Sequence, residues 1–322
     1  MIIKPNGKIS CCCDNNLDGY NFGNMFISSI EDIWNGEYAA QIRKSCWEGQ
    51  YGYCNFNHCY PKFIDKNKFE AYYDEKSGVY GKNPKLIEFG HDIQCNVACI
   101  TCRSKKIFLS KQQVEKYDSL IEPLFIPILK DAQEVFINSS GEVFASPHSK
   151  KLVSAIISKY PNIKFMLISN GILFNEKNAI ELLGDLNKLI YAQISIHAAT
   201  EETYNKIVVG GNFDKAMQNI KWLAKLKREQ KLNVLLVFVV QAINYMEMKQ
   251  FVELAVSLDV TARFSNYRNW SGGLVSQQYK DYAVFLKEHP QYNDLKKILK
   301  DPIFEDRHCI LNTLLANIRN EN

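Results

Sequence analysis

Short β-strand patterns alternate with amphipathic helical patterns through the middle of this 322-residue chain, and this alternation constrains its fold most strongly. The six predicted strands are Leu86–Phe89, Glu134–Asn138, Lys164–Ser169, Leu189–Ile196, Asn233–Val240 and Val260–Phe264. The predicted helices between them include Ser149–Lys159, Glu176–Gly184, Phe213–Glu229 and Met246–Leu258. Six β/α units in this order predict a parallel sheet wrapped by helices, with ligands at the carboxyl ends of its strands.

Composition and the distribution of cysteines limit the classes of function that this chain can have. Nine of the ten cysteines precede residue 103, and Met1–Pro5 is too short for a signal peptide, so we expect metal ligation in the cytoplasm rather than disulfides. The formal net charge of +4 is too small to predict nucleic-acid binding. No run of about 18 apolar residues exists, so we expect no membrane span.

Three cysteines directly follow the first predicted strand, with the spacing C-x3-C-x2-C at Cys95, Cys99 and Cys102. Three thiolates this close can hold three corners of a cubane iron–sulfur cluster and leave one iron open to a small molecule. Zinc is the alternative, although its sites usually pair C-x2-C knuckles. A ferredoxin-type cluster would need a fourth cysteine nearby, and the next one is Cys309, which could be a hydrogen donor or a core thiol.

Polar side chains follow three of the other strands. Gly141 and Glu142 follow the second strand, where a carboxylate could accept hydrogen bonds from an ammonium group or could simply face solvent. Ser195 and His197 end the fourth strand and alternate, which predicts that they share a face; a structural role for His197 stays open. The fifth strand leads into Gln241 and Asn244, which are candidate ligands or, respectively, a loop residue and a helix cap.

With its cysteines after the first strand, the chain resembles the radical SAM enzymes. The Ser140-Gly141-Glu142 run is similar to their Gly-Gly-Glu element, with Ser140 in place of the first glycine. His197 stands where an Asp is usual, and Thr101 stands where a bulky residue is usual. The resemblance implies a partial (β/α)6 TIM-like barrel over residues 84–274, with a [4Fe-4S] cluster that binds S-adenosylmethionine. It also implies cofactor-binding roles for Gly141, Glu142, Ser195, His197 and Gln241.

Residues 1–64 are loop-rich and hold six cysteines, and residues 275–322 are an irregular carboxy-terminal extension. The run Pro5–Cys13, the turn Phe22-Gly23-Asn24 and the helix containing Ile33-Trp34-Asn35 resemble a SPASM or twitch module, here placed before the barrel. The resemblance implies an auxiliary iron–sulfur cluster. Its best ligands are Cys12, Cys54 and Cys59, with Cys13 or Cys46 as the fourth. A zinc site of Cys12, Cys13, Cys54 and Cys59 is the alternative.

These resemblances together predict an enzyme that cleaves S-adenosylmethionine to a 5′-deoxyadenosyl radical for C–H abstraction. The expected substrate is a peptide, which would be oxidised, crosslinked or epimerised; a sugar or another small molecule is the alternative. The expected electron donor is a flavodoxin or a ferredoxin. The rival hypothesis is a non-catalytic iron–sulfur or zinc protein, which would have no reason to place a carboxylate such as Glu142 at an open iron.

Overall fold

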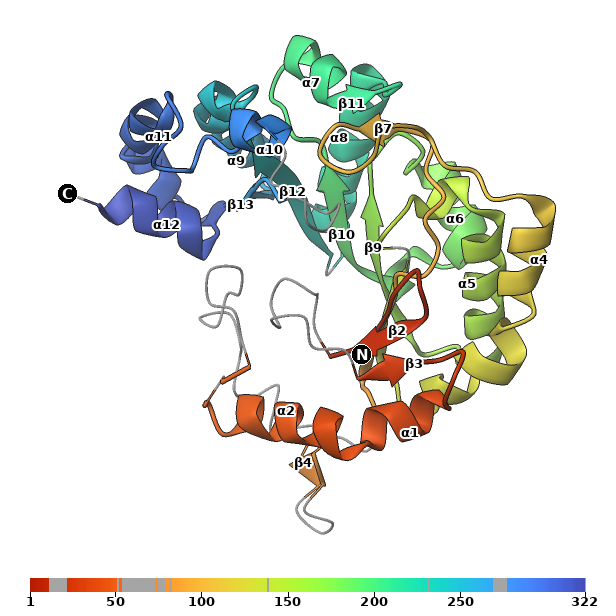
Figure 1. Ribbon diagram of the computed structural model, residues 1–322. Helices are drawn as coiled ribbons and strands as arrows, with labels where there is room; N and C mark the ends of the chain where they lie inside the picture. The colour runs from red at the N-terminus through yellow and green to blue at the C-terminus, as the bar shows by residue number, and fades with distance from the viewer. Residues whose placement is uncertain are drawn as a thin grey trace. The chain divides into compact units, whose positions relative to one another are not determined.

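The computed structural model describes residues 1–11, 22–50, 52–53, 73–74, 79–80, 83–137, 139–230, 232–268 and 277–321. The chain divides into two compact units, and each combines parallel strands with helices (Figure 1). The first unit consists of residues 1–94, 109–167 and 182–189. The second consists of residues 95–108, 168–181 and 190–322.

The first unit contains a mixed sheet with the strand order β9-β8-β6-β1-β2-β3. Strands β6 (Leu86–Phe89), β8 (Glu134–Ile137) and β9 (Lys164–Ser169) run parallel. Strand β1 (Ile2–Ile3) joins the other edge of β6, also in parallel, and continues into antiparallel β2 (Lys8–Ser10) and β3 (Gly23–Asn24). The amino-terminal segment is therefore built onto the first strand of the parallel sheet.

Helices of the first unit begin at strong caps. Ser110 forms a capping box with Gln113 at α4 (Lys111–Asp118), and Ser146 caps α5 (Pro147–Lys159), which has proline at its first position. The remaining elements are α1 (Ile30–Asn35), α2 (Glu37–Trp47), η2 (Ile121–Phe125), η3 (Pro127–Leu129), η4 (Val143–Ala145), η5 (Leu186–Lys188) and the strand pair β4 (Tyr73–Asp74) and β5 (Val79–Tyr80).

The second unit has four parallel strands in the order β14-β13-β12-β10. They are β10 (Leu189–Ser195), β12 (Asn233–Val240), β13 (Thr261–Asn266) and β14 (Cys309–Leu311). The other elements are α6 (Glu176–Leu183), α7 (Glu201–Ile207), α8 (Phe213–Glu229), η6 (Tyr245–Glu247), α9 (Met248–Leu258), α10 (Gln277–Tyr282), α11 (Tyr292–Leu299), η7 (Pro302–Glu305), α12 (Thr313–Asn320) and the pair β7 (Ala98–Cys99) and β11 (Val208–Val209).

Aromatic side chains form the core on one face of this four-stranded layer. Phe238 of β12 and Phe264 of β13 pack against Phe251 of α9, with ring centroids 4.8 and 5.7 Å apart, and Phe264 also meets Phe304 at 5.9 Å. All four rings are buried. Because side chains alternate along a strand, Val237, Val239 and Arg263 belong to the opposite face.

All six predicted strands are present, with ends that differ by at most two residues among the described positions. The predicted helix Met246–Leu258 is shorter, because a 3-10 turn precedes α9, and the predicted helix Ser149–Lys159 instead begins at Pro147. Strand β14 was not predicted, since three residues carry too little periodicity to be distinguished from a loop.

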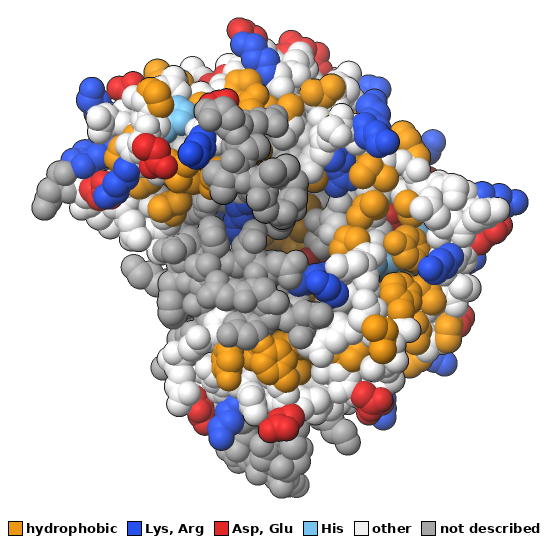
Figure 2. All heavy atoms as spheres, viewed as in Figure 1, with side chains coloured by type: hydrophobic (Ala, Val, Ile, Leu, Met, Phe, Trp, Pro, Cys, Tyr) orange, Lys and Arg blue, Asp and Glu red, His pale blue; other side chains and the backbone are white. Residues whose placement is uncertain are grey.

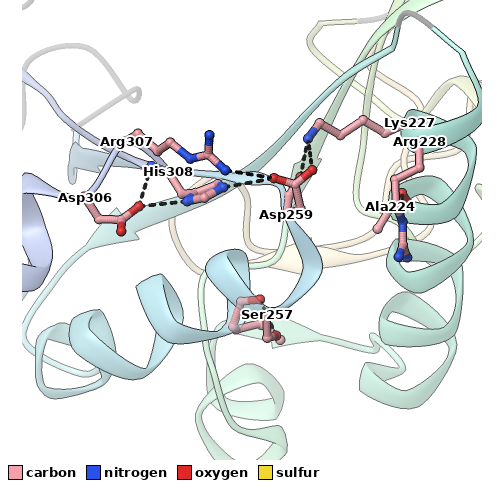
Figure 3. A network of polar contacts seen from close by, with 9 residues as sticks. Ala224, Lys227, Arg228, Ser257, Asp259, Asp306, Arg307 and His308 are labelled. Atoms are coloured by element: carbon pink, nitrogen blue, oxygen red, sulfur yellow. Dashed lines mark hydrogen bonds and ion pairs between the residues drawn. The ribbon is translucent and has the colours of Figure 1, made fainter.

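A network of charged side chains fixes the approach to β14 (Figure 3). Asp259, whose φ of 52° ends α9 in the left-handed region, accepts from Lys227 Nζ at 2.7 Å and contacts His308 Nε2 at 3.0 Å. His308 Nδ1 lies 2.7 Å from Asp306. Hydrogen bonding from Lys227, and then from His308, lowers the pKa of Asp259 to about 2.

No helix in the described part of the chain is long and apolar enough to cross a membrane. On the face shown in Figure 2, basic and acidic side chains lie among one another. This mixture agrees with the small net charge of +4.

Candidate functional site

The three predicted cluster cysteines lie on one closed loop of the second unit. Cys95 and Ile107 exchange backbone hydrogen bonds of 2.9 and 3.2 Å, which joins the two ends of the loop. Within it, Ala98 and Cys99 pair with Val208 and Val209 as antiparallel β7 and β11. Cys95 is buried, Cys99 is half-buried and Cys102 is exposed. The solvent exposure of the three cysteines therefore increases along the loop.

Buried polar groups of the first unit hold the chain on either side of this loop. The side-chain oxygen of Gln94, the residue before Cys95, accepts from the backbone N–H of Leu109 at 3.1 Å. The Gln94 amide group also donates to Ser146 Oγ at 3.3 Å. Asp92 accepts from the Gln94 backbone N–H at 2.9 Å and from Ser146. Sequence reasoning missed Asp92 and Gln94, because no local motif marks them.

The middle thiol of the loop is difficult to ionise in its buried surroundings. Burial, followed by the nearby Cys95 and Cys102, raises the pKa of the Cys99 thiol to about 12, so ionising this group calls for a bound cation. No three His, Cys, Asp or Glu side chains of the described residues converge as ligands of one metal ion. A cubane takes one thiolate at each of three irons, so its sulfurs need not meet at a point.

Glu142 lies at the end of the second barrel strand and is completely buried. Its backbone N–H donates to the carbonyl of Gln94 at 2.7 Å, and its Oε1 accepts from Phe144 N–H at 3.3 Å. Nearby, Gly90 leaves room for the loop that precedes Glu142, because a Cβ there would lie 2.7 Å from Ser139 Oγ. The carboxylate beside half-buried Gly141 is thus withdrawn from solvent, where a cationic ligand would gain most from it.

His197 does not continue the alternation expected from Ser195. Strand β10 ends at Ser195, and His197 adopts a left-handed φ of 59°, so the argument that they share a face fails. The His197 Nδ1 accepts from the Val239 backbone N–H at 3.2 Å, which assigns the ring proton to Nε2. Burial lowers the pKa of His197 to about 4, so the ring is neutral near pH 7 and offers a donor.

Gln241 and Asn244 at the end of β12 have different roles. Asn244 donates to the carbonyls of His197 and Val239 at 2.8 and 2.9 Å and accepts from Gln241 N–H at 2.9 Å. Of the two alternatives for Asn244, the helix cap holds only for its position: it precedes η6, but its side chain makes no cap hydrogen bond and instead ties two strand ends together. The Gln241 side chain is fully buried, yet neither polar atom of its amide has a partner within the described residues.

Asn170, at the end of β9, is a further site residue. Its amide nitrogen donates to Asn96 Oδ1 at 2.8 Å and lies 4.0 Å from Cys95 Sγ. Sequence reasoning gave Asn170 no role. The left-handed Gly171 that follows, with a φ of 82°, is the local signal of this turn.

The predicted auxiliary ligands Cys12, Cys13, Cys54 and Cys59 lie outside the described residues. Cys46 lies on α2 and is half-buried, and the predicted helix that contains Trp34 is present as α1. Cys309 pairs in register with Ala262, on the face covered by Phe264 and the helices, and burial raises its pKa to about 12. Its position favours a core thiol over a hydrogen donor.

Comparison with known families agrees with this geometry. The profile of the Radical SAM superfamily matches residues 93–255, just over half of the chain. The chain belongs to the radical SAM superfamily. The profile of an iron–sulfur cluster-binding domain, SPASM, matches residues 1–60. The expected fold class, a partial (β/α)6 TIM-like barrel with a small amino-terminal module, is confirmed, and the two families imply [4Fe-4S] clusters and S-adenosylmethionine as cofactors.

Individual relatives are distant. A GTP 3′,8-cyclase of Petrotoga mobilis is 24% identical over 226 residues, covering 69% of this chain and 65% of the relative. Streptococcus suis SuiB bound to S-adenosylmethionine has a TM-score of 0.48 and 15% identity, over 88% of this chain and 62% of that one. The enzyme anSMEcpe with bound AdoMet and a peptide has a TM-score of 0.48 and 20% identity, over 70% and 62%. This chain therefore spans less than two thirds of the length of each of these three relatives.

Proposed function

We propose that this chain is an enzyme that uses S-adenosylmethionine for radical C–H abstraction, with its active cluster on Cys95, Cys99 and Cys102. When bound to the reduced cluster, S-adenosylmethionine supplies a 5′-deoxyadenosyl radical that abstracts hydrogen from a substrate. The observation that carries the proposal is the closed three-cysteine loop directly after β6. The family match over residues 93–255 supports it.

Four side chains would bind the cofactor. Glu142 offers a buried carboxylate to the methionyl ammonium, and Gly141 lets the backbone come close. Neutral His197 offers its Nε2–H, and half-buried Ser195 offers a hydroxyl, to the oxygens of the ribose or the carboxylate. Gln241 offers a buried amide whose donor and acceptor have no partner among the residues that the structure describes. This unsatisfied amide is the feature of the strand ends that best fits a polar ligand.

The test is anaerobic cleavage of S-adenosylmethionine by the reduced protein. The wild-type protein should be brown and should form 5′-deoxyadenosine, whereas replacing Cys95, Cys99 and Cys102 together with Ala should abolish the product. Cys309→Ala is the matched control, because that thiol lies on the helix-covered face, and it should keep wild-type turnover. Undiminished cleavage in the triple variant would disprove the assignment.

For the substrate we propose a peptide, since the chain resembles SPASM and twitch proteins that modify peptides.

We further propose that residues 1–64 hold an auxiliary cluster on Cys12, Cys54 and Cys59, with Cys13 or Cys46 as the fourth ligand. That cluster would either accept an electron from the substrate radical or hold the substrate in position. Residues 84–274 would form the catalytic barrel and residues 275–322 an extension. We also propose that the protein works in the cytoplasm, where a flavodoxin or a ferredoxin would donate the electron that reduces the active cluster.

A small-molecule substrate is the second candidate. The observation that favours it is the 24% identity to a GTP 3′,8-cyclase over 226 residues. The two candidates are separated by adding either GTP or a synthetic copy of any short peptide encoded beside this gene. Formation of 5′-deoxyadenosine should increase, and a modified product should appear by mass spectrometry, only with the substrate class that is correct.

A further inference from the structure

One arginine side chain is directed at a cluster cysteine. The guanidinium of Arg103 donates from Nε and from Nη2 to Cys102 Sγ, at 3.3 and 3.2 Å. Two donors of one planar group therefore reach the same sulfur. Because Arg stays protonated, these are charge-assisted hydrogen bonds to the exposed member of the cysteine set.

The backbone fixes this geometry locally. Both Cys102 N–H and Arg103 N–H donate to the carbonyl of Cys99, each at 2.9 Å, so the two residues sit on one tight turn. The turn is held in place from the other side, since Ile100 N–H donates to the Ile207 carbonyl at 2.9 Å. The contact between Arg103 and Cys102 thus lies on a turn that the cysteine loop and the residue before β11 hold in place.

Neighbouring basic residues differ from Arg103. Lys105 and Lys106 are both exposed on the same loop. The ammonium group of Lys106 lies close to Gly210, where a Cβ would come within 2.8 Å of Nζ. For Lys105 no hydrogen bond to a cysteine is found within the described residues, which makes it a matched control for charge without a sulfur contact.

We propose that Arg103 is a positioning residue that raises the reduction potential of the active cluster through its two hydrogen bonds to the Cys102 sulfur. This inference rests on the proposed function, in which Cys102 is a cluster ligand. Reduction adds one negative charge to the cluster and its thiolates, and donors to the sulfurs stabilise that charge. Arg103 would therefore let a weaker reductant deliver the electron, without itself touching the substrate.

The experiment measures the cluster's midpoint potential in the anaerobically reconstituted full chain, by redox titration followed by paramagnetic resonance. The active cluster is recognised because S-adenosylmethionine perturbs its signal. Arg103→Met should lower the ratio of reduced to oxidised cluster about ten-fold at a fixed potential, which is about 59 mV for one electron. Lys105→Met, which loses the same charge two residues away, should change that ratio less than about two-fold, because exposed charges are screened.

The outcomes separate this inference from the proposed function. If S-adenosylmethionine perturbs no paramagnetic resonance signal of the wild-type protein, both the proposed function and the role of Arg103 are wrong. A wild-type signal together with an unchanged potential in Arg103→Met, or an equal shift in Lys105→Met, would overturn only the role of Arg103. If Arg103→Met assembles no active cluster, Arg103→Gln, which removes the charge but keeps a polar side chain, is titrated instead, and an unshifted potential there would likewise overturn the role of Arg103.

Discussion

Gln241 combines full burial with an amide that has no partner within the described residues, and this makes its role measurable in two ways. Gln241→Met should stabilise the ligand-free protein by about 1 kcal/mol, because it removes an unsatisfied buried polar group that costs about 1–3 kcal/mol. The same change should weaken binding of S-adenosylmethionine. Chemical denaturation and a cofactor titration followed by paramagnetic resonance check the two signs.

Asn244 gives the control for Gln241. It is a buried amide in the same loop, but its hydrogen bonds go to the carbonyls of His197 and Val239. Asn244→Leu should therefore destabilise the ligand-free protein by about 1–3 kcal/mol, since two buried acceptors lose their donor. If Gln241→Met is destabilising and binds the cofactor normally, its amide has a structural role instead.

Glu142 is the residue whose charge matters most to the proposed cofactor site. Glu142→Gln keeps the shape and the acceptor for Phe144 N–H but removes the charge. Affinity for S-adenosylmethionine should fall roughly 10- to 150-fold, because hydrogen bonds to charged groups contribute about 1.5–3 kcal/mol. Iron content should not change, since Glu142 is not proposed as a metal ligand. Glu134→Gln, at the opposite end of β8, is the control; equal affinity in the Glu142 variant and the wild type would refute the assignment.

At the level of elements, the charge network around Asp259 attaches β14 to the helix ends of the second unit (Figure 3). Its pKa is lowered from 3.8 to about 2, so the stabilisation is fully present above about pH 4 and is lost as the pH falls toward 2. Asp259→Asn should therefore be less stable than the wild type at pH 6, and the difference should shrink below about pH 4.

Unfolding midpoints measured from pH 6 to pH 3 check this prediction for Asp259. Asp294→Asn is the control, because Asp294 makes an exposed pair with Lys297 at 3.7 Å, and such pairs contribute little. A stability difference for Asp259→Asn that stays constant down to pH 3 would show that the carboxylate does not titrate with folding.

For the whole molecule, two groups of cysteines far apart in the sequence predict two separate metal centres. After replacement of Cys95, Cys99 and Cys102 with Ala, iron and sulfide should remain bound, because the six cysteines of residues 1–64 are untouched. Iron, sulfide and zinc assays on the purified variant test this. One zinc and no sulfide would replace the auxiliary cluster with a zinc module.

The strands, most helices and the cysteine loop were predictable because each depends on a local pattern. Short apolar runs mark Leu86–Phe89 and Asn233–Val240, and the spacing of the three cysteines is itself the signal for their chemistry. The family match over residues 93–255 agrees with that prediction. Ser110 and other caps likewise act within one helical turn.

The tertiary structure alone decided which polar groups are satisfied. Whether an amide has a partner depends on residues far away in sequence. The bond from Asn170 to Asn96 therefore left no local trace, and neither did the lack of a partner for the Gln241 amide among the described residues. The same holds for His197, whose left-handed backbone and bond to Val239 require β12 beside it. Local periodicity places a strand, but hydrogen bonds and burial between distant segments determine what its last side chains can do.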